Sequence, residues 1–96
     1  MNGKVRWSAA KDAELQKRYG FGFDRVLAAI DLGGLLEERR HPNTERYPHQ
    51  WQLMIEIETY VWVVPFVRQE RGIFLKTFFP SRKATREYLR GTDDER

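Results

Sequence analysis

The segment from Phe74 to Leu89 combines an apolar run, a proline and a basic run, a pattern that suits the binding of a phosphate group. Pro80 cannot donate a hydrogen bond to a central sheet ladder, so a strand is expected to end there. Ser81 is a favourable N-cap, and the free N–H groups of a helix that begins at Ser81 favour a negatively charged ligand. Four basic side chains lie close to this junction: Lys76, Arg82, Lys83 and Arg86. The sequence therefore predicts an anion-binding corner between a strand and a helix.

The expected C-terminal helix has one basic side and one apolar side. Arg82, Arg86 and Arg90 recur at positions i, i+4 and i+8, so they share one face. The side chains expected to face the protein are Ala84, Tyr88 and Leu89. An ordinary solvated helix face is the alternative explanation of the charges. The convergence of the cap, the proline and Lys76 on one corner favours phosphate binding.

Length and composition predict one small domain with a modest core. The chain has 96 residues, of which 41% are hydrophobic and 14% aromatic, and these fractions exclude a disordered chain. Its 17 basic and 14 acidic residues give a net charge of +3, which is compatible with a nucleic-acid partner. We expect the domain to span residues 1–96, with a frayed acidic tail over residues 92–96.

The absence of cysteine excludes a disulfide and a thiolate metal site, and it indicates a reducing cytoplasm. No apolar stretch approaches the ~20 residues that a membrane span requires. The charged start of the chain, residues 1–11, lacks the apolar run of a signal peptide. We therefore expect a cytoplasmic protein without a membrane partner.

Local signals in the first third of the chain predict a helical hairpin. After a short strand or anchoring segment at Val5–Trp7, Ser8 can cap a helix over residues 9–19 that ends at Gly20. A second helix is indicated by an apolar stripe at i, i+3, i+4 and i+7, and the glycines at 33 and 34 close it. This stripe consists of Phe23, Val26, Leu27 and Ile30.

The middle of the chain predicts an antiparallel meander of four strands, over residues 35–40, 51–57, 60–67 and 73–79. Alternation in the second strand places Gln52, Met54 and Glu56 on its polar, exposed face. The third strand is apolar on both faces and should be central, with a bulge or a local break in pairing at Pro65. The helical hairpin, the meander and a final helix give an α+β fold in the order β-α-α-β-β-β-β-α.

Two segments resemble the BrnT family of toxins from bacterial toxin–antitoxin pairs. The first contains Trp7, Lys11 and the run Lys17-Arg18-Tyr19-Gly20, followed by Phe23. It is similar to the Trp, the spaced lysines and the basic-His-Gly turn of that family. The second is the run Ser81-Arg82-Lys83-Ala84-Thr85-Arg86-Glu87-Tyr88, which is similar to the family's Ser-Ala-Arg-Arg-Ala-Thr run with a following Glu and Tyr. The order of helices and strands also matches over nearly the whole chain.

BrnT-like toxins belong with the RelE/ParE-like small proteins, so the resemblance implies a RelE-like fold and a ribonuclease that cuts RNA. It also implies a protein partner, a cognate antitoxin of the ribbon-helix-helix class. The segment His41–Pro48 looks like a related, uncharacterised subgroup of toxins. The alternative function is a non-catalytic module of the same fold, which inhibits a protein target as ParE-like relatives do, or binds nucleic acid or the antitoxin without cutting. Cleavage of a transcript separates the two functions.

Cleavage of RNA by attack of a 2′-OH on its own phosphate needs a proton acceptor, cations near the phosphate and a proton donor for the leaving 5′-oxygen, but no metal or other cofactor. The cationic role suits three residues: Lys76, Arg82 and Lys83. Proton donation suits His41, Tyr47 or Tyr88. Glu56 is a candidate acceptor, or alternatively a salt-bridge partner of Lys76 or an arginine. Contacts to the RNA are expected from six residues: Lys17, Arg18, Arg46, Arg86, Tyr88 and Arg90.

Histidines and aromatic residues in the middle of the chain each have two explanations. His41 and His49 flank a polar loop, as acid–base groups or as ordinary surface residues. Their spacing, without cysteine, lacks a known zinc-ligand pattern, so no metal site is expected. Tyr60, Trp62 and Phe66 are either a platform on which RNA bases stack or part of the core. Their alternation with valines favours the core.

Overall fold

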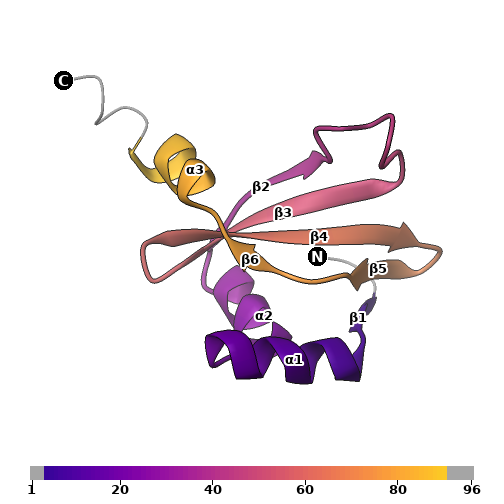
Figure 1. Ribbon diagram of the computed structural model, residues 1–96, viewed down its shortest axis with the longest axis horizontal. Helices are drawn as coiled ribbons and strands as arrows, with labels where there is room; N and C mark the ends of the chain where they lie inside the picture. Colours follow the sequence, from indigo (N-terminus) through magenta and orange to yellow (C-terminus); the bar gives the residue numbers. More distant parts are fainter. Residues whose placement is uncertain (1–3, 91–96) are drawn as a thin grey trace.

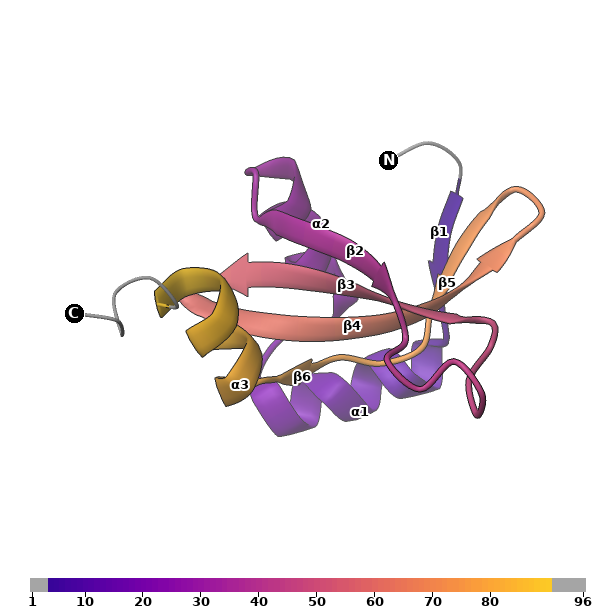
Figure 2. The same ribbon diagram turned by 90° about the horizontal axis from the view of Figure 1, so that it is seen from above.

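The computed structural model describes residues 4–90, Arg90 without its side chain, and shows a mixed α+β fold (Figure 1). A six-stranded sheet runs through the molecule, with helices on both of its faces (Figures 1 and 2). The elements in chain order are β1 (Lys4–Trp7), α1 (Ala9–Tyr19), α2 (Phe23–Asp31), β2 (Leu35–Arg40), β3 (Gln50–Ile57), β4 (Tyr60–Gln69), β5 (Gly72–Leu75), β6 (Phe79–Pro80), α3 (Arg82–Thr85) and the π-helix η1 (Arg86–Arg90). The predicted α+β class is confirmed.

The hairpin of α1 and α2 forms at the predicted positions because each end has a local signal. Ser8 caps α1 by accepting a hydrogen bond from a backbone N–H of the first turn at 3.1 Å. Gly20 ends α1 in the left-handed conformation, with a φ of 86°. Gly22 precedes α2 and has no side chain to cap it, so Asp12 of α1 accepts a hydrogen bond from the N–H of Phe23 at 2.8 Å. Asp12 thus joins the two helices.

Strands β2, β3, β4 and β5 form the predicted antiparallel meander, with β4 between β3 and β5. The meander is only part of the sheet, because the predicted first strand, β1, pairs with β5 in parallel orientation and the unpredicted β6 pairs with β4. Parallel pairing of Lys4 with Gly72 requires a glycine, since a Cβ at position 72 would overlap the backbone of Lys4. No short-range pattern links these two segments. The sequence therefore predicts a strand at residues 5–7 but not its partner.

Pro65 marks a break in pairing on one side of β4, as predicted. On the β3 side the register is continuous. On the other side, β4 pairs with β5 through Phe66–Gln69 and with β6 through Trp62 and Val63. The carbonyl of Pro65 accepts a hydrogen bond from the N–H of Lys76 at 2.8 Å, but its ring nitrogen has no proton to donate. The strand predicted over residues 73–79 is therefore two short strands, and Pro80 lies within the second of them.

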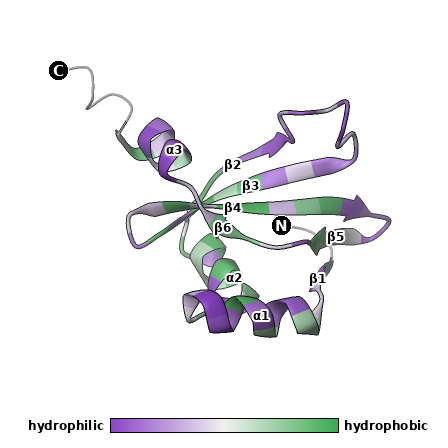
Figure 3. Ribbon diagram, in the orientation of Figure 1, coloured by the Kyte–Doolittle hydropathy of each residue, from purple (hydrophilic) through white to green (hydrophobic). Residues whose placement is uncertain are grey.

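The sheet buries side chains on both faces, but unequally. The face under α1 and α2 carries the main core, which includes Leu15, Phe23, Leu53, Phe66 and Phe78. The opposite face carries a smaller cluster beneath α3 and η1, which consists of Met54, Val61, Val63 and Ala84. In Figure 3, β3 becomes more hydrophilic with distance from α3. The prediction that one face of β3 is exposed is wrong, because Met54 is fully buried and Gln52 is 7% exposed.

The two-residue turn between β3 and β4 is strained. Glu58 and Thr59 have φ angles of 51° and 65°, in the left-handed region. A type I′ turn requires this geometry at both positions, and sequences such as Asn-Gly provide it without strain. Each left-handed non-glycine residue costs about 1–2 kcal/mol, and threonine is the less tolerant because it is β-branched. The protein accepts this cost at the end of its two longest strands.

We expect Thr59→Gly to stabilise the protein, because glycine adopts a φ of 65° without a side-chain clash. The free energy of unfolding should rise by about 1 kcal/mol, since the strain removed exceeds the entropy that glycine adds to the unfolded chain. Urea denaturation measures the difference. Thr59→Ala, which keeps a Cβ, is the control and should have a smaller effect. A glycine variant less stable than wild type would show that the turn stores no strain.

Candidate nucleic-acid interface

The predicted helix start at Ser81 is present, and Thr85 fixes it to the sheet. The Ser81 hydroxyl accepts a hydrogen bond from the N–H of Ala84 at 3.0 Å. Thr85 is buried, donates to the carbonyl of Ser81 at 2.7 Å and accepts from the N–H of Val61 in β4 at 2.8 Å. The N–H of Ser81 in turn donates to the carbonyl of Val61 at 3.0 Å. These hydrogen bonds therefore fix the start of α3 over Val61 of β4.

Beyond Thr85 the helix widens into the π-helix η1, which differs from the uniform α-helix that the arginine spacing predicts. Tyr88 and Leu89 pack on the small cluster, as expected. The Tyr88 hydroxyl donates a hydrogen bond to the carboxylate of Glu37 in β2. Burial, and then this hydrogen bond, raises the pKa of Tyr88 above its usual value of 10.0. Tyr88, predicted to contact RNA or to donate a proton, thus holds η1 against β2.

The sheet face opposite α1 and α2 is only partly covered by α3 and η1. Its uncovered part forms a depression, which we call the open-face groove. It consists of two adjoining cavities that share Gln52 and Phe79. The cavity beside α3 is also lined by Arg39, Pro42, Met54, Val63, Ser81, Lys83, Ala84 and Glu87. The cavity beside the polar loop is also lined by Lys11, His41, Tyr47, Gln50, Pro65, Lys76 and Thr77. Side chains from distant parts of the chain thus line one depression.

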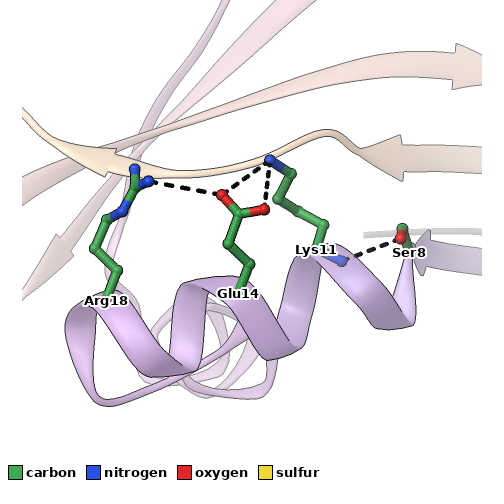
Figure 4. A network of polar contacts seen from close by, with 4 residues as sticks. All are labelled: Ser8, Lys11, Glu14 and Arg18. Carbon is green, nitrogen blue, oxygen red and sulfur yellow. Dashed lines mark hydrogen bonds and ion pairs between the residues drawn. The ribbon is translucent and has the colours of Figure 1, made fainter.

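The open-face groove carries more positive than negative charge. Its basic lining residues are Lys11, Arg39, Lys76 and Lys83. Among the lining residues that the structure describes, Glu87 is the acidic one. Lys11 and Arg18 share the carboxylate of Glu14 on α1, at 3.3 and 3.6 Å, so the charge of Lys11 is partly balanced (Figure 4). The groove therefore favours an anionic ligand.

Gln52 lies where the two cavities meet, and it is a site residue that sequence reasoning missed. Its side-chain Oε1 accepts a hydrogen bond from Nε of Arg39 at 3.0 Å. This contact fixes the orientation of the amide and leaves its NH2 group, with two donors, for a ligand in the groove. A single glutamine in a strand has no sequence signal that separates it from a surface residue.

The polar loop between β2 and β3 forms one rim of the open-face groove. Asn43 orders this loop, since its N–H donates to His41 Nδ1 at 2.9 Å and its carbonyl accepts from the N–H of Tyr47 at 2.9 Å. The ring centroids of His41 and Tyr47 lie 4.4 Å apart. Because His41 Nδ1 is an acceptor, the ring proton lies on Nε2, and His41 presents a hydrogen-bond donor. His49 is exposed on the loop and is not a lining residue.

The structure brings together four of the six predicted catalytic residues: His41, Tyr47, Lys76 and Lys83. Arg82 is exposed on α3, one residue before Lys83, and does not line the groove. Glu56 shares a face of β3 with Gln52 but lies four residues farther along, which is about 13 Å. Within the described residues, Glu56 forms no ion pair with Lys76 or an arginine. The predicted proton acceptor therefore does not line the groove, and it lies along the sheet from the position of Lys76, whose N–H bonds to the carbonyl of Pro65 opposite Gln52.

The residues predicted to contact RNA are spread over the surface. Arg46 adjoins the groove, with its guanidinium carbon 5.6 Å from the ring centroid of Tyr47. Lys17 and Arg18 are exposed in the last turn of α1, which covers the other face of the sheet. Arg86 is exposed on η1. The side chain of Arg90 lies outside the described residues.

Neither a metal-binding cluster nor a membrane-spanning helix is present in the described residues. Within residues 4–90, no three His, Asp or Glu side chains gather in a way that could hold a metal ion. In the same part of the chain, no helix is long and apolar enough to cross a membrane. The prediction of a metal-free site stays a prediction.

Comparison with known proteins gives no match: no family model, curated protein or solved structure is similar to this chain. The BrnT resemblance and the RelE-like assignment of the fold therefore remain predictions from the sequence.

We expect Thr85→Val to destabilise the protein, because valine keeps the volume of threonine but leaves the N–H of Val61 without its partner. The free energy of unfolding should fall by about 1–3 kcal/mol, the range for a buried group that loses its hydrogen bond. Thr85→Ser keeps the hydroxyl and should lose less. Denaturation of all three proteins in urea tests this. Equal losses in the two variants would assign the role of Thr85 to packing alone.

The raised pKa of Tyr88 predicts a contribution to stability that disappears at alkaline pH. A group whose pKa is higher in the folded state stabilises the fold while protonated, and this stabilisation is lost as the pH rises from 10.0 through the folded-state pKa. Near neutral pH, Tyr88→Phe should be about 1 kcal/mol less stable than wild type, because it lacks the bond to Glu37. This difference should shrink above pH 10.0 in urea titrations of both proteins. A difference that is independent of pH would contradict the prediction.

Proposed function

We propose that this chain is a metal-independent endoribonuclease, a toxin of the BrnT-like class, that holds single-stranded RNA in the open-face groove. The observation that carries the proposal is that His41 and Tyr47 of the β2–β3 loop line the same groove as Lys76 and Lys83, about 30 residues later in the sequence. These residue types are the ones that attack by an internal 2′-OH requires. The BrnT resemblance of both ends of the chain supports the same function.

Single-stranded RNA suits the combination of charge and aromatic rings in this groove. Arg39, Lys76 and Lys83 provide cations for the phosphates. The rings of His41 and Tyr47 provide a surface for an unpaired base, and such stacking is worth about 1–3 kcal/mol per base. Bases of duplex RNA are not free to stack in this way. The groove therefore favours a single strand over a duplex.

In the proposed reaction the 2′-oxygen attacks the adjacent phosphorus, the bond to the 5′-oxygen breaks, and a 2′,3′-cyclic phosphate forms. Negative charge grows on the non-bridging phosphate oxygens, where Lys76, Lys83 and the Gln52 amide are the donors. Glu87 takes the proton-acceptor role that the residue pattern assigned to Glu56, because Glu87 lines the groove. The Tyr47 hydroxyl is the donor to the leaving oxygen. The nucleophile belongs to the substrate, so the mechanism requires no cofactor.

An antitoxin would silence this site by covering it, and an acidic segment suits the positive charge of the groove. A ribbon-helix-helix antitoxin is the partner that the BrnT resemblance implies. The second candidate function is a non-catalytic module that holds RNA or a protein in the same groove. The separation of Glu56 from Lys76 along the sheet is the observation that favours this second function.

We expect the double variant Lys76→Ala/Lys83→Ala to cleave RNA about 10²–10³-fold more slowly than wild type, because it removes the donors to the developing phosphate charge. Single-turnover cleavage of a 5′-labelled, unstructured RNA in excess EDTA measures the rate. The 5′ fragment should end in a 2′,3′-cyclic phosphate. Full activity in the double variant would remove the groove from the mechanism, and loss of wild-type cleavage in EDTA would contradict metal independence.

The matched control is Arg82→Ala, which removes a cation from the same helix as Lys83 but outside the groove. This variant should stay within a few-fold of wild type. Thermal unfolding of every variant separates lost stability from lost chemistry. Wild-type protein that binds the RNA but leaves it uncut would favour the non-catalytic module.

A further inference from the structure

A further cavity lies on the other face of the sheet and is lined by residues of the α1–α2 hairpin, the β3–β4 turn and β4. Four aromatic side chains line it: Tyr19, Phe21, Tyr60 and Trp62. Tyr19 and Phe21 each meet Trp62 at 5.0 Å between ring centroids, with interplanar angles of 87° and 69°. All four residues are partly exposed, and Tyr19, Phe21 and Trp62 also pack against the main core, as the alternation predicted for Trp62. We call this cavity the aromatic pocket.

The aromatic pocket also carries one donor group and one acceptor group. Arg25 and Glu58 both line it and form an ion pair, in which the distance of 3.8 Å is longer than a hydrogen bond. The Glu58 side chain is 85% exposed. It projects from the strained turn, and strain of this kind is concentrated at functional sites. The pocket therefore offers stacking surfaces, a guanidinium and a carboxylate to one ligand.

We propose that the aromatic pocket binds a guanine base of single-stranded RNA. Guanine presents an acceptor, O6, next to two donors, N1–H and the N2 amino group. The carboxylate of Glu58 can accept from both donors, and Arg25 can donate to O6. Adenine, with a donor at C6 and an acceptor at N1, reverses this pattern. A cationic side chain from a protein partner fits less well, because Arg25 would repel it.

The register of β6 places the aromatic pocket beside the open-face groove. Phe79 pairs with Val63 and lines the groove, whereas its neighbour Pro80 pairs with Trp62, which lines the aromatic pocket. The two sites thus lie on opposite faces of the sheet, and both reach this two-residue strand. A strand of RNA in the groove can cross β6 and place a base in the pocket. This link rests on the proposed function, but guanine binding by the pocket does not.

The test uses nucleosides, which lack the phosphate that the groove would bind. Guanosine, inosine, adenosine, cytidine and uridine are titrated into the full-length protein, and the indole N–H signal of Trp62 is followed by NMR. Trp62→Phe assigns this signal among the three tryptophans of the chain. Guanosine should shift it and bind about tenfold or more tightly than adenosine, while inosine, which lacks the N2 amino group, should lose most of this advantage.

Glu58→Gln should weaken guanosine binding about tenfold, because an amide can accept from only one of the two donors. Glu70→Gln, an exposed carboxylate at the β4–β5 turn, is the matched control and should bind as wild type does. Equal binding of guanosine and adenosine, an unmoved Trp62 signal, or normal binding by Glu58→Gln would each overturn the proposal. Guanosine binding without RNA cleavage would contradict the proposed function alone, and cleavage without guanosine binding would contradict the pocket alone.

Discussion

The arrangement of this protein depends on how the backbone N–H and C=O groups in the first half of β4 find hydrogen-bond partners on the side away from β3, where β5 does not reach. Pro65 prevents a continuous ladder on that side, so the backbone groups of the first half of β4 need other partners. Two short elements supply them: β6 pairs with Trp62 and Val63, and the buried hydroxyl of Thr85 accepts from Val61. The same contacts fix the start of α3. The side chains of this helix that line the groove are therefore placed by the hydrogen-bonding needs of a strand.

The docking of α3 and η1 on β4 divides one face of the sheet into a packed half and an open half. The packed half holds Met54 under η1, and the Tyr88 hydroxyl ties η1 to β2. The open half is left with Gln52 at its floor, cations at its walls and the loop ordered by Asn43 at its rim. An anionic ligand would therefore meet a site whose loop and helix are already ordered by hydrogen bonds, which lowers the cost of ordering on binding.

Local signals in the sequence predicted those elements whose causes are local. Ser8, Gly20 and Ser81 act within one turn of a helix, and each has its predicted role. The parallel partner of β1 could not be predicted, because the contact between Lys4 and Gly72 has no local pattern. The groove was half predictable. Alternation places Glu56 and Gln52 on one face, but their distance from α3 depends on where Thr85 docks. The docking of Thr85 also decides that Lys83, and not Arg82, lines the groove.

The pairing of β1 with β5 has a consequence for the order of events in folding. These strands are adjacent in the sheet, yet the paired residues Lys4 and Gly72 are separated by most of the chain. Contacts between distant segments form slowly, because a large loop must close before the pairing contributes. A growing chain that emerges from its N-terminus can build the helical hairpin early, whereas β1 has no partner until β5 has been synthesised. The complete sheet, with the groove on its face, is thus a product of the last third of synthesis.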